Sequence, residues 1–139
     1  MNHHDLPDFP DVVEQHFPYD GPHTDDTVLD ALRGAQSLIR YANNATSRRG
    51  VLNGPSVYRS ASAAAAMAHG LVQLLDQLAD AARQVAEDPT AYDDRRDRPA
   101  SQTAIEVGLH LDVARDKVAA VTRPLDQAAI VASHIGHDR

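Results

Sequence analysis

The feature that most constrains this chain is the spacing of its apolar residues, which alternates between four and three positions over two long stretches. The first stretch keeps this spacing through Val57, Ala61, Ala64, Ala68, Leu71, Leu75, Leu78, Ala82 and Val85. The second keeps it through Val107, Leu111, Ala114, Val118, Val121, Leu125, Ala128, Ala132 and Ile135. Such spacing places all members of a row on one face of an α-helix. It predicts two long helices, one over 56–87 and one that begins at Pro99 or Ser101.

Local signals set the ends of these helices and predict a third, shorter helix before them. Five apolar residues share one helical face over 25–45: Val28, Leu32, Ala35, Ile39 and Ala42. Thr24 is the expected N-cap of this helix, and the hydroxyl of Ser56 is the expected cap of the next one. Asp88 and Pro89 should end the 56–87 helix, because proline cannot continue it. The charged segment 90–98 has no apolar period and is expected to be a loop.

Pro124 lies inside the last predicted helix and leaves two interpretations open. The apolar period continues through the proline in the same phase, which favours one continuous, kinked helix. Thr122 could instead cap a separate fourth helix. Both interpretations predict the same fold class, an all-α antiparallel bundle of three long helices joined by short connections. Matching helix levels in this bundle places His110 level with position 79.

The formal net charge of −7 is concentrated at the N-terminal end. Residues 1–26 contain seven acidic side chains and no Lys or Arg, so the rest of the chain is balanced, with 13 acidic and 13 basic residues. Four prolines before residue 24 preclude a long helix there. We therefore expect two parts, an irregular acidic segment at 1–23 and a helical bundle domain at 24–139.

Two groups of apolar residues are the candidate partner-binding sites. In the N-terminal segment, Phe9, Val13 and Phe17 are four residues apart, and Asp8 followed by Pro10 is a cap signal for two helical turns.

In the last helix, Ile105 and Leu109 point away from the main apolar row, with Val113 nearby, at the end of the bundle that the short 25–45 helix does not reach. An exposed apolar patch needs a cover. The N-terminal segment could cover it, another protein could bind to either group, or the patch could be buried in a symmetric dimer.

Catalytic, metal and cofactor chemistry find no support in the sequence. There is no cysteine, and the three helical histidines lie too far apart along the bundle to share a metal ion. The carboxylate pairs Asp76 with Asp80 and Asp112 with Asp116 are expected on a solvated face, in local ion pairs with Arg83 and Arg115. No phosphate-binding loop or nucleophile motif occurs.

Membrane and nucleic-acid partners are not expected either. The longest apolar run is far shorter than the roughly 20 residues that span a bilayer, and no secretory signal is recognisable, so a cytoplasmic location is expected. The three arginines of 95–98 are interleaved with Asp93, Asp94 and Asp97, so the net charge of this cluster is zero. The sequence thus favours a non-enzymatic interaction protein that binds another protein or itself. A regulator that binds a small ligand in the bundle interior, or nucleic acid through the arginine loops, is the alternative.

Overall fold

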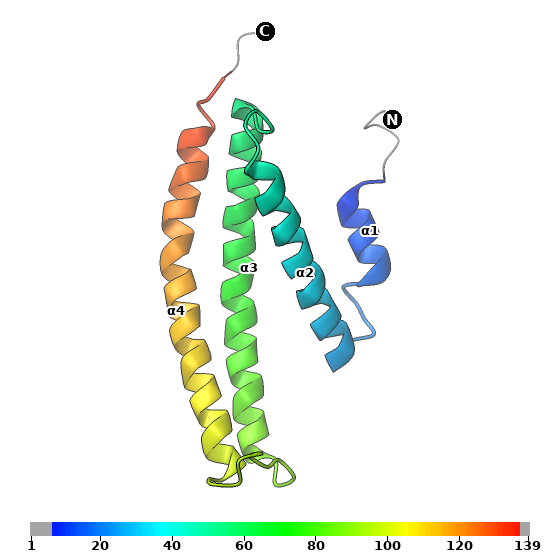
Figure 1. The fold of residues 1–139 in the computed structure, drawn as a ribbon, viewed down its shortest axis with the longest axis vertical. Helices are drawn as coiled ribbons and strands as arrows, with labels where there is room; N and C mark the ends of the chain where they lie inside the picture. Colours follow the sequence, from blue (N-terminus) through cyan, green and yellow to red (C-terminus); the bar gives the residue numbers. More distant parts are fainter. Residues whose placement is uncertain (1–6, 137–139) are drawn as a thin grey trace. The chain divides into compact units, whose positions relative to one another are not determined.

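The computed structural model describes residues 7–136, and this part of the chain is helical without any strand. The elements are α1 (Phe9–His16), α2 (Asp25–Thr46), α3 (Gly54–Glu87) and α4 (Ala100–Ala132) (Figure 1). The predicted all-α class with three long helices is confirmed. The chain forms two compact units, Met1–Val51 with α1 and α2, and Leu52–Arg139 with α3 and α4. The expected boundary between 23 and 24 and the packing of the 25–45 helix on the other two stay predictions.

The first unit begins with a short helix inside the segment expected to be irregular. Pro10 occupies the first turn of α1, where its missing N–H costs no hydrogen bond, but the side chain of Asp8 makes no capping hydrogen bond. The predicted start of α2 is confirmed in detail. The hydroxyl of Thr24 accepts from the backbone N–H of Thr27 at 3.1 Å, and the hydroxyl of Thr27 accepts from the N–H of Thr24 at 2.9 Å. This reciprocal pair satisfies two otherwise unpaired donors.

The start of α3 differs from the prediction, because Asn53 and not Ser56 caps the helix. The Asn53 Oδ1 atom accepts from the backbone N–H of Ser56 at 2.9 Å. Pro55 then lies in the first turn, a position that its fixed φ angle suits. The helix therefore begins slightly earlier than expected and ends at Glu87, as the Asp88–Pro89 signal predicts.

Helix α4 runs without a break through Pro124, so the predicted continuous helix is confirmed and the separate fourth helix is wrong. The hydroxyl of Thr122 donates to the carbonyl oxygen of Ala119 at 2.7 Å, within the same helix. It caps no new helix start. The proline lacks an N–H and leaves the carbonyl of Ala120, four residues earlier, without its helical donor.

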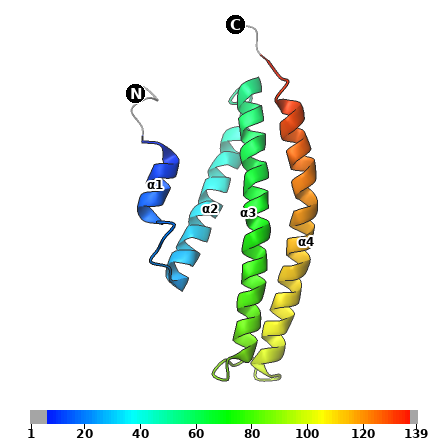
Figure 2. The ribbon, with the colours of Figure 1, turned by 180° about the vertical axis from the view of Figure 1, so that it is seen from behind.

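In the second unit, α3 and α4 lie side by side as an antiparallel hairpin (Figures 1 and 2). The buried residues of their contact seam are all small: Ala65, Ala68, Ala79, Ala104, Gly108, Ala129 and Ala132. Larger seam residues, such as Leu75 and Leu125, are half-buried. Among the described residues no apolar side chain larger than alanine is buried. Small side chains let two helix backbones approach closely but remove little apolar area from water.

The seam keeps half of each predicted row and replaces the other half by the residues one position further along. Ala68 of α3 and Leu125 of α4 lie in the seam as predicted. On α3 the seam passes through Ala65, Val72 and Ala79, where the sequence predicted Ala64, Leu71 and Leu78, and on α4 it passes through Gly108, Arg115 and Ala129 in place of Val107, Ala114 and Ala128.

The predicted level of the two helices agrees with the structure. A Cβ atom on Gly108 would lie 3.5 Å from the carbonyl oxygen of Ala79, close to the predicted match of His110 with position 79. The replacement of seam residues therefore reflects a rotation of each helix about its own axis, without any shift along that axis. We call this change the rotation of the seam. Close approach through Ala and Gly turns part of the larger apolar residues away from the seam.

Candidate functional site

The rotation of the seam divides the hairpin into two different faces. Each residue turns a helix by about 100°, and the two helices run in opposite directions, so residues just before the seam positions lie on the same side in both. On α3 and α4 these residues form two rows, which we call the apolar face: Val57, Ala64, Leu71, Leu78, Val85, Val107, Ala114, Val121 and Ala128. All of them are exposed or half-buried, with Leu71 at 39% and Val107 at 46% exposure.

A cleft confirms that the two rows share one side of the hairpin. Val85 of α3 and Val107 of α4 both line a hollow of about 260 Å³, together with Tyr92 of the connecting loop. The remaining lining residues are Ala82, Ala91, Ala100, Thr103 and Ala104. The apolar face therefore ends, at the loop, in a hollow lined mainly by apolar side chains.

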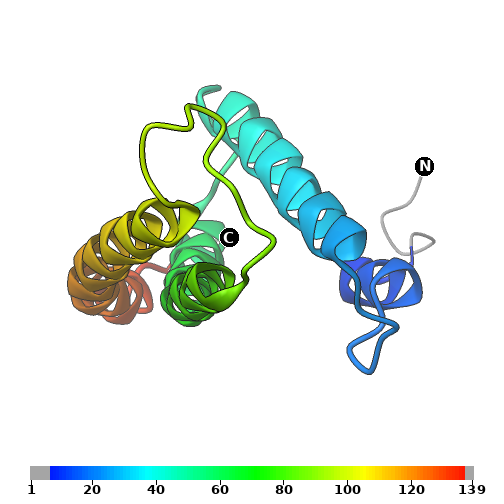
Figure 3. The same cartoon turned by 90° about the horizontal axis from the view of Figure 1, so that it is seen from below.

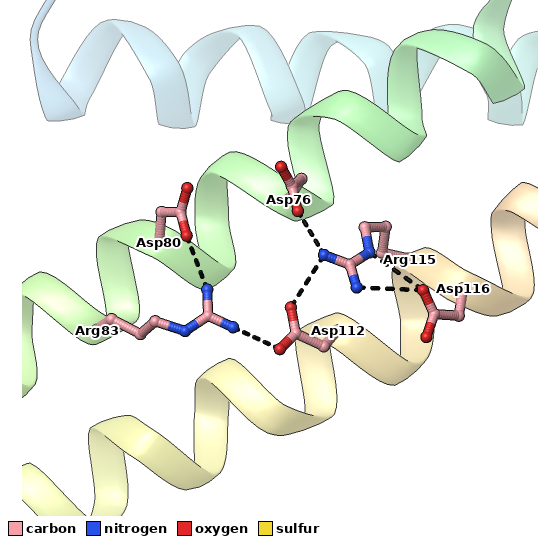
Figure 4. A network of polar contacts seen from close by, with 6 residues as sticks. All are labelled: Asp76, Asp80, Arg83, Asp112, Arg115 and Asp116. Carbon is pink, nitrogen blue, oxygen red and sulfur yellow. Dashed lines mark hydrogen bonds and ion pairs between the residues drawn. The ribbon is translucent and has the colours of Figure 1, made fainter.

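The opposite side, which we call the polar face, carries a network of ion pairs that crosses between the helices (Figure 4). Arg83 of α3 pairs with Asp80 at 2.7 Å and reaches across to Asp112 of α4. Arg115 of α4 pairs with Asp116 at 3.2 Å and reaches across to Asp76 of α3. Asp112 also lies 3.3 Å from Arg115, which joins the two halves into one network.

This network agrees with the predicted solvated face and adds contacts between the helices that the sequence does not predict. The carboxylate of Asp76 raises the pKa of Arg115 by accepting its hydrogen bond. Each arginine is held by carboxylates of both helices, so the network fixes the level of α3 against α4. The four carboxylates are thereby committed to the two guanidinium groups and do not form an open acid/base pair.

A second contact across the seam joins His69 of α3 to Asp126 of α4, whose Nε2 and Oδ2 atoms lie 3.0 Å apart. The pair lines an open groove of about 550 Å³ on the polar face. The side chains of Tyr58, Ser62, Ile130 and Ser133 also line this groove. It combines apolar walls with a few polar groups.

The loop between α3 and α4 is organised around Asp93, the one buried charged residue of the described chain. Figure 3 looks along the hairpin from the end that carries this loop. The carboxylate of Asp93 accepts from the backbone N–H of Arg95 at 2.9 Å, from the Arg95 guanidinium at 3.1 Å and from the hydroxyl of Thr103. These hydrogen bonds hold the pKa of Asp93 well below its usual range.

The arginines of this loop are engaged within the chain. Arg98 pairs with Glu106 at 2.6 Å and lies 3.6 Å from Asp93, and its hydrogen bond lowers the pKa of Glu106. The guanidinium of Arg96 stacks over the ring of Tyr92, 5.0 Å from its centre. A phosphate group would have to compete with these partners.

The predicted partner-binding residues lie in both units, and all six are exposed. Phe9 and Val13 lie on α1, and Phe17 follows its last residue. Ile105, Leu109 and Val113 lie on the part of α4 that faces away from the apolar face, and Leu109 is 61% exposed. Their role in binding stays a prediction.

The spacing of the apolar residues does not by itself predict the apolar face. The spacing places these residues in the core, because an apolar row at helical spacing usually is the core. The signal that could have found it was the set of alanines, together with Gly108, one position further along each helix.

The described residues contain no group of three His, Asp or Glu side chains placed to hold a metal ion. Within the same range, no helix combines the length and the apolar character needed to cross a membrane.

No family model, curated protein or solved structure matches this chain.

Proposed function

We propose that this chain is a non-enzymatic helical interaction protein of the cytoplasm, an adaptor, regulator or assembly subunit that binds through exposed apolar side chains. One observation carries the proposal: the buried residues of the hairpin seam are Ala and Gly, while the larger apolar residues of the same helices are exposed or half-buried. Burying only small side chains removes little apolar area from water. A partner that covers the larger ones adds the missing stabilisation.

Two of the exposed groups have the form of binding anchors. Phe9, Val13 and Phe17 present apolar side chains on and beside a short helix that also carries Asp11 and Glu14. A segment of this kind docks in an apolar groove, and its acidic groups favour a basic partner. Ile105, Leu109 and Val113 form a second strip on α4, and they suit a partner helix that lies along it.

The alternative, a regulator that binds nucleic acid, has less support. Arg95 and Arg98 are paired with Asp93 and Glu106, so binding of a phosphate would first break existing ion pairs. The groove beside His69 and Asp126 supports a small ligand better than the loop supports nucleic acid, but it is wide open to solvent. Neither the arginine loop nor the groove explains why so many large apolar side chains of this chain are exposed.

The test compares full-length variants that remove one anchor group at a time. Phe9→Ala with Phe17→Ala removes the first group, and Ile105→Ser with Leu109→Ser removes the second. Val131→Ala is the matched control, because Val131 is an exposed apolar residue outside both groups. Tagged chains are purified from the cells that express them, the co-purifying protein is identified, and its affinity is measured with purified components.

We expect at least one double variant to lose roughly tenfold or more in affinity, as buried interface anchors do. The helical content by circular dichroism should stay unchanged, and the Val131→Ala chain should bind like the wild type. Undiminished affinity in both double variants would contradict the proposed anchors.

A further inference from the structure

The apolar face of the hairpin is uncharged along its whole length. Its α3 row repeats every seven residues from Val57 to Val85, and its α4 row repeats every seven residues from Val107 to Ala128. No member of either row is acidic or basic, although the chain carries a net charge of −7. The ion pairs of α3 and α4 described above lie on the polar face or at the loop. A partner can therefore cover the apolar face without removing any of these charges from water.

The level of the two helices makes the two rows complementary. A Cβ atom on Gly108 would lie 3.5 Å from the carbonyl oxygen of Ala79 and 4.0 Å from the side chain of Ala82. Both helices rise equally per residue, so this contact sets Leu71 close to the level of Val118. The height of Leu71 along the hairpin therefore lies between those of Ala114 and Val121, two α4 residues of the apolar face. In the same way, Ala64 falls between Val121 and Ala128, and Leu78 falls between Val107 and Ala114.

A second copy of the same hairpin can pack on the apolar face, because the α3 residues of this face lie at heights between those of its α4 residues. A two-fold axis parallel to the helices places α3 of one copy against α4 of the other, antiparallel and at unchanged height. Leu71 of one copy then enters the space between Ala114 and Val121 of the other, and the same contact forms again across the axis. Such mutual insertion of large side chains beside small ones is how four-helix bundles pack. The interface uses the same surface on both copies, as two-fold dimers do.

We propose that a second copy of this chain docks on the apolar face, so that two α3–α4 hairpins form a four-helix bundle with both polar faces outward. This inference rests on the proposed function and names one partner for it. A foreign partner would have to present two uncharged rows with the same spacing to fill the face equally well. The chain itself supplies them.

The first experiment measures the mass of the full chain in solution by size-exclusion chromatography with light scattering. The wild type should have twice the chain mass of 15.1 kDa from micromolar to submillimolar concentrations. Leu71→Glu places a carboxylate in the centre of the interface and should give a species of 15.1 kDa with unchanged helical content. Gln73→Glu adds the same charge on an exposed position of α3 outside the apolar face and should leave the dimer intact.

A monomeric wild type, or a Leu71→Glu chain that stays dimeric while folded, would overturn the proposal. The first result would mean that the face is covered within the chain or by another protein. The second would mean that the dimer forms through a different surface.

The second experiment tests the arrangement and uses the absence of cysteine in the chain. Full-length Leu71→Cys and Ala114→Cys are mixed, equilibrated and treated with a short bis-maleimide. We expect links between α3 of one variant and α4 of the other to dominate over links between identical variants. Val113→Cys replaces Ala114→Cys in the control, because Val113 is exposed on α4 outside the apolar face. Equal linking of this control, or a majority of links between two Leu71→Cys chains, would overturn the arrangement.

Failure of this inference and failure of the proposed function give different results. A monomeric wild type whose partner binding depends on Phe9 or Leu109 overturns the dimer alone. A dimer that dissociates on Leu71→Glu, together with unchanged partner binding in the Phe9 and Leu109 variants, overturns the proposed anchors alone.

Discussion

Gly108 of α4 lies against the main chain of α3 at Ala79, so that a Cβ atom built on Gly108 would be 3.5 Å from the Ala79 carbonyl oxygen. This distance is ordinary van der Waals contact, which leaves room for one methyl group and for little more. The pair therefore sets both the spacing and the level of the two helices at this end of the hairpin.

Two substitutions at Gly108 should have opposite effects on stability. Gly108→Ala should stabilise the chain by about 0.5 to 1 kcal/mol, because alanine favours a helix interior more than glycine does. Gly108→Leu should destabilise it by about 1 to 3 kcal/mol, because the longer side chain forces the helices apart. Urea unfolding followed by circular dichroism measures both. Equal effects of the two substitutions would show that the helices are not in close contact there.

Asp93 should be essential for the order of the loop between α3 and α4. Asp93→Asn removes the charge that the Arg95 guanidinium and the Thr103 hydroxyl surround, and leaves Arg95 and Arg98 with one fewer partner. We expect the melting temperature to fall by several degrees. Asp94→Asn is the control, because Asp94 is exposed in the same loop. Equal melting temperatures of the two variants would contradict the role of Asp93.

The same carboxylate predicts how stability depends on pH. The pKa of Asp93 is lower in the folded chain than in the unfolded chain, so its contribution is complete above the unfolded value of about 3.9. The contribution is lost as the pH falls from that value toward the lower folded pKa. Glu106, whose pKa Arg98 also lowers, adds a loss of the same sign.

Unfolding curves of the wild type and Asp93→Asn between neutral pH and pH 2 measure this contribution. The stability difference between the two chains should be constant down to about pH 4 and then shrink. A difference that stays constant throughout would show that the folded pKa of Asp93 is not lowered.

Arg115 should hold α3 and α4 together through the polar-face network. Arg115→Gln removes its pairs with Asp76, Asp112 and Asp116, and should lower the melting temperature. Because salt screens exposed ion pairs, the difference from the wild type should shrink in concentrated sodium chloride. Lys117→Gln is the control, since Lys117 is exposed and has no ion pair among the described residues. A loss that salt does not reduce would point to packing of the Arg115 stem instead.

The sequence predicts the helices of this fold well, because helix ends depend on nearby residues. Thr24, Asp88 and Pro89 act within one helical turn, and their effects appear in the structure as predicted. Asn53 was missed in favour of Ser56, since both residue types cap helices and only the geometry of Pro55 separates them.

The candidate site was harder to predict, because it depends on which of two adjacent rows faces the partner helix. Leu71 and Val72 differ by one position, and hydrophobicity alone favours the row that contains the leucines. The hairpin instead packs most closely through small residues such as Ala65 and Ala79. A contact across the seam, such as that of His69 with Asp126, can be predicted only when both the relative level of the two helices and the rotation of each helix about its axis are known. Matching the two helices across the loop 88–99 predicts their level, whereas the rotation depends on how closely the backbones approach.

Pro124 gives a last prediction about the continuous α4. Proline removes one hydrogen bond from a helix interior and is about 3 kcal/mol less favourable there than alanine, although it also restricts the unfolded chain. Pro124→Ala should therefore stabilise the chain by about 1 to 2 kcal/mol in urea unfolding, with the helical content slightly raised. Ala120→Pro would place a second proline one turn earlier and should have the opposite sign. If Pro124→Ala left stability unchanged, the helix around Pro124 would not be continuous in solution, and the separate fourth helix would have to be reconsidered.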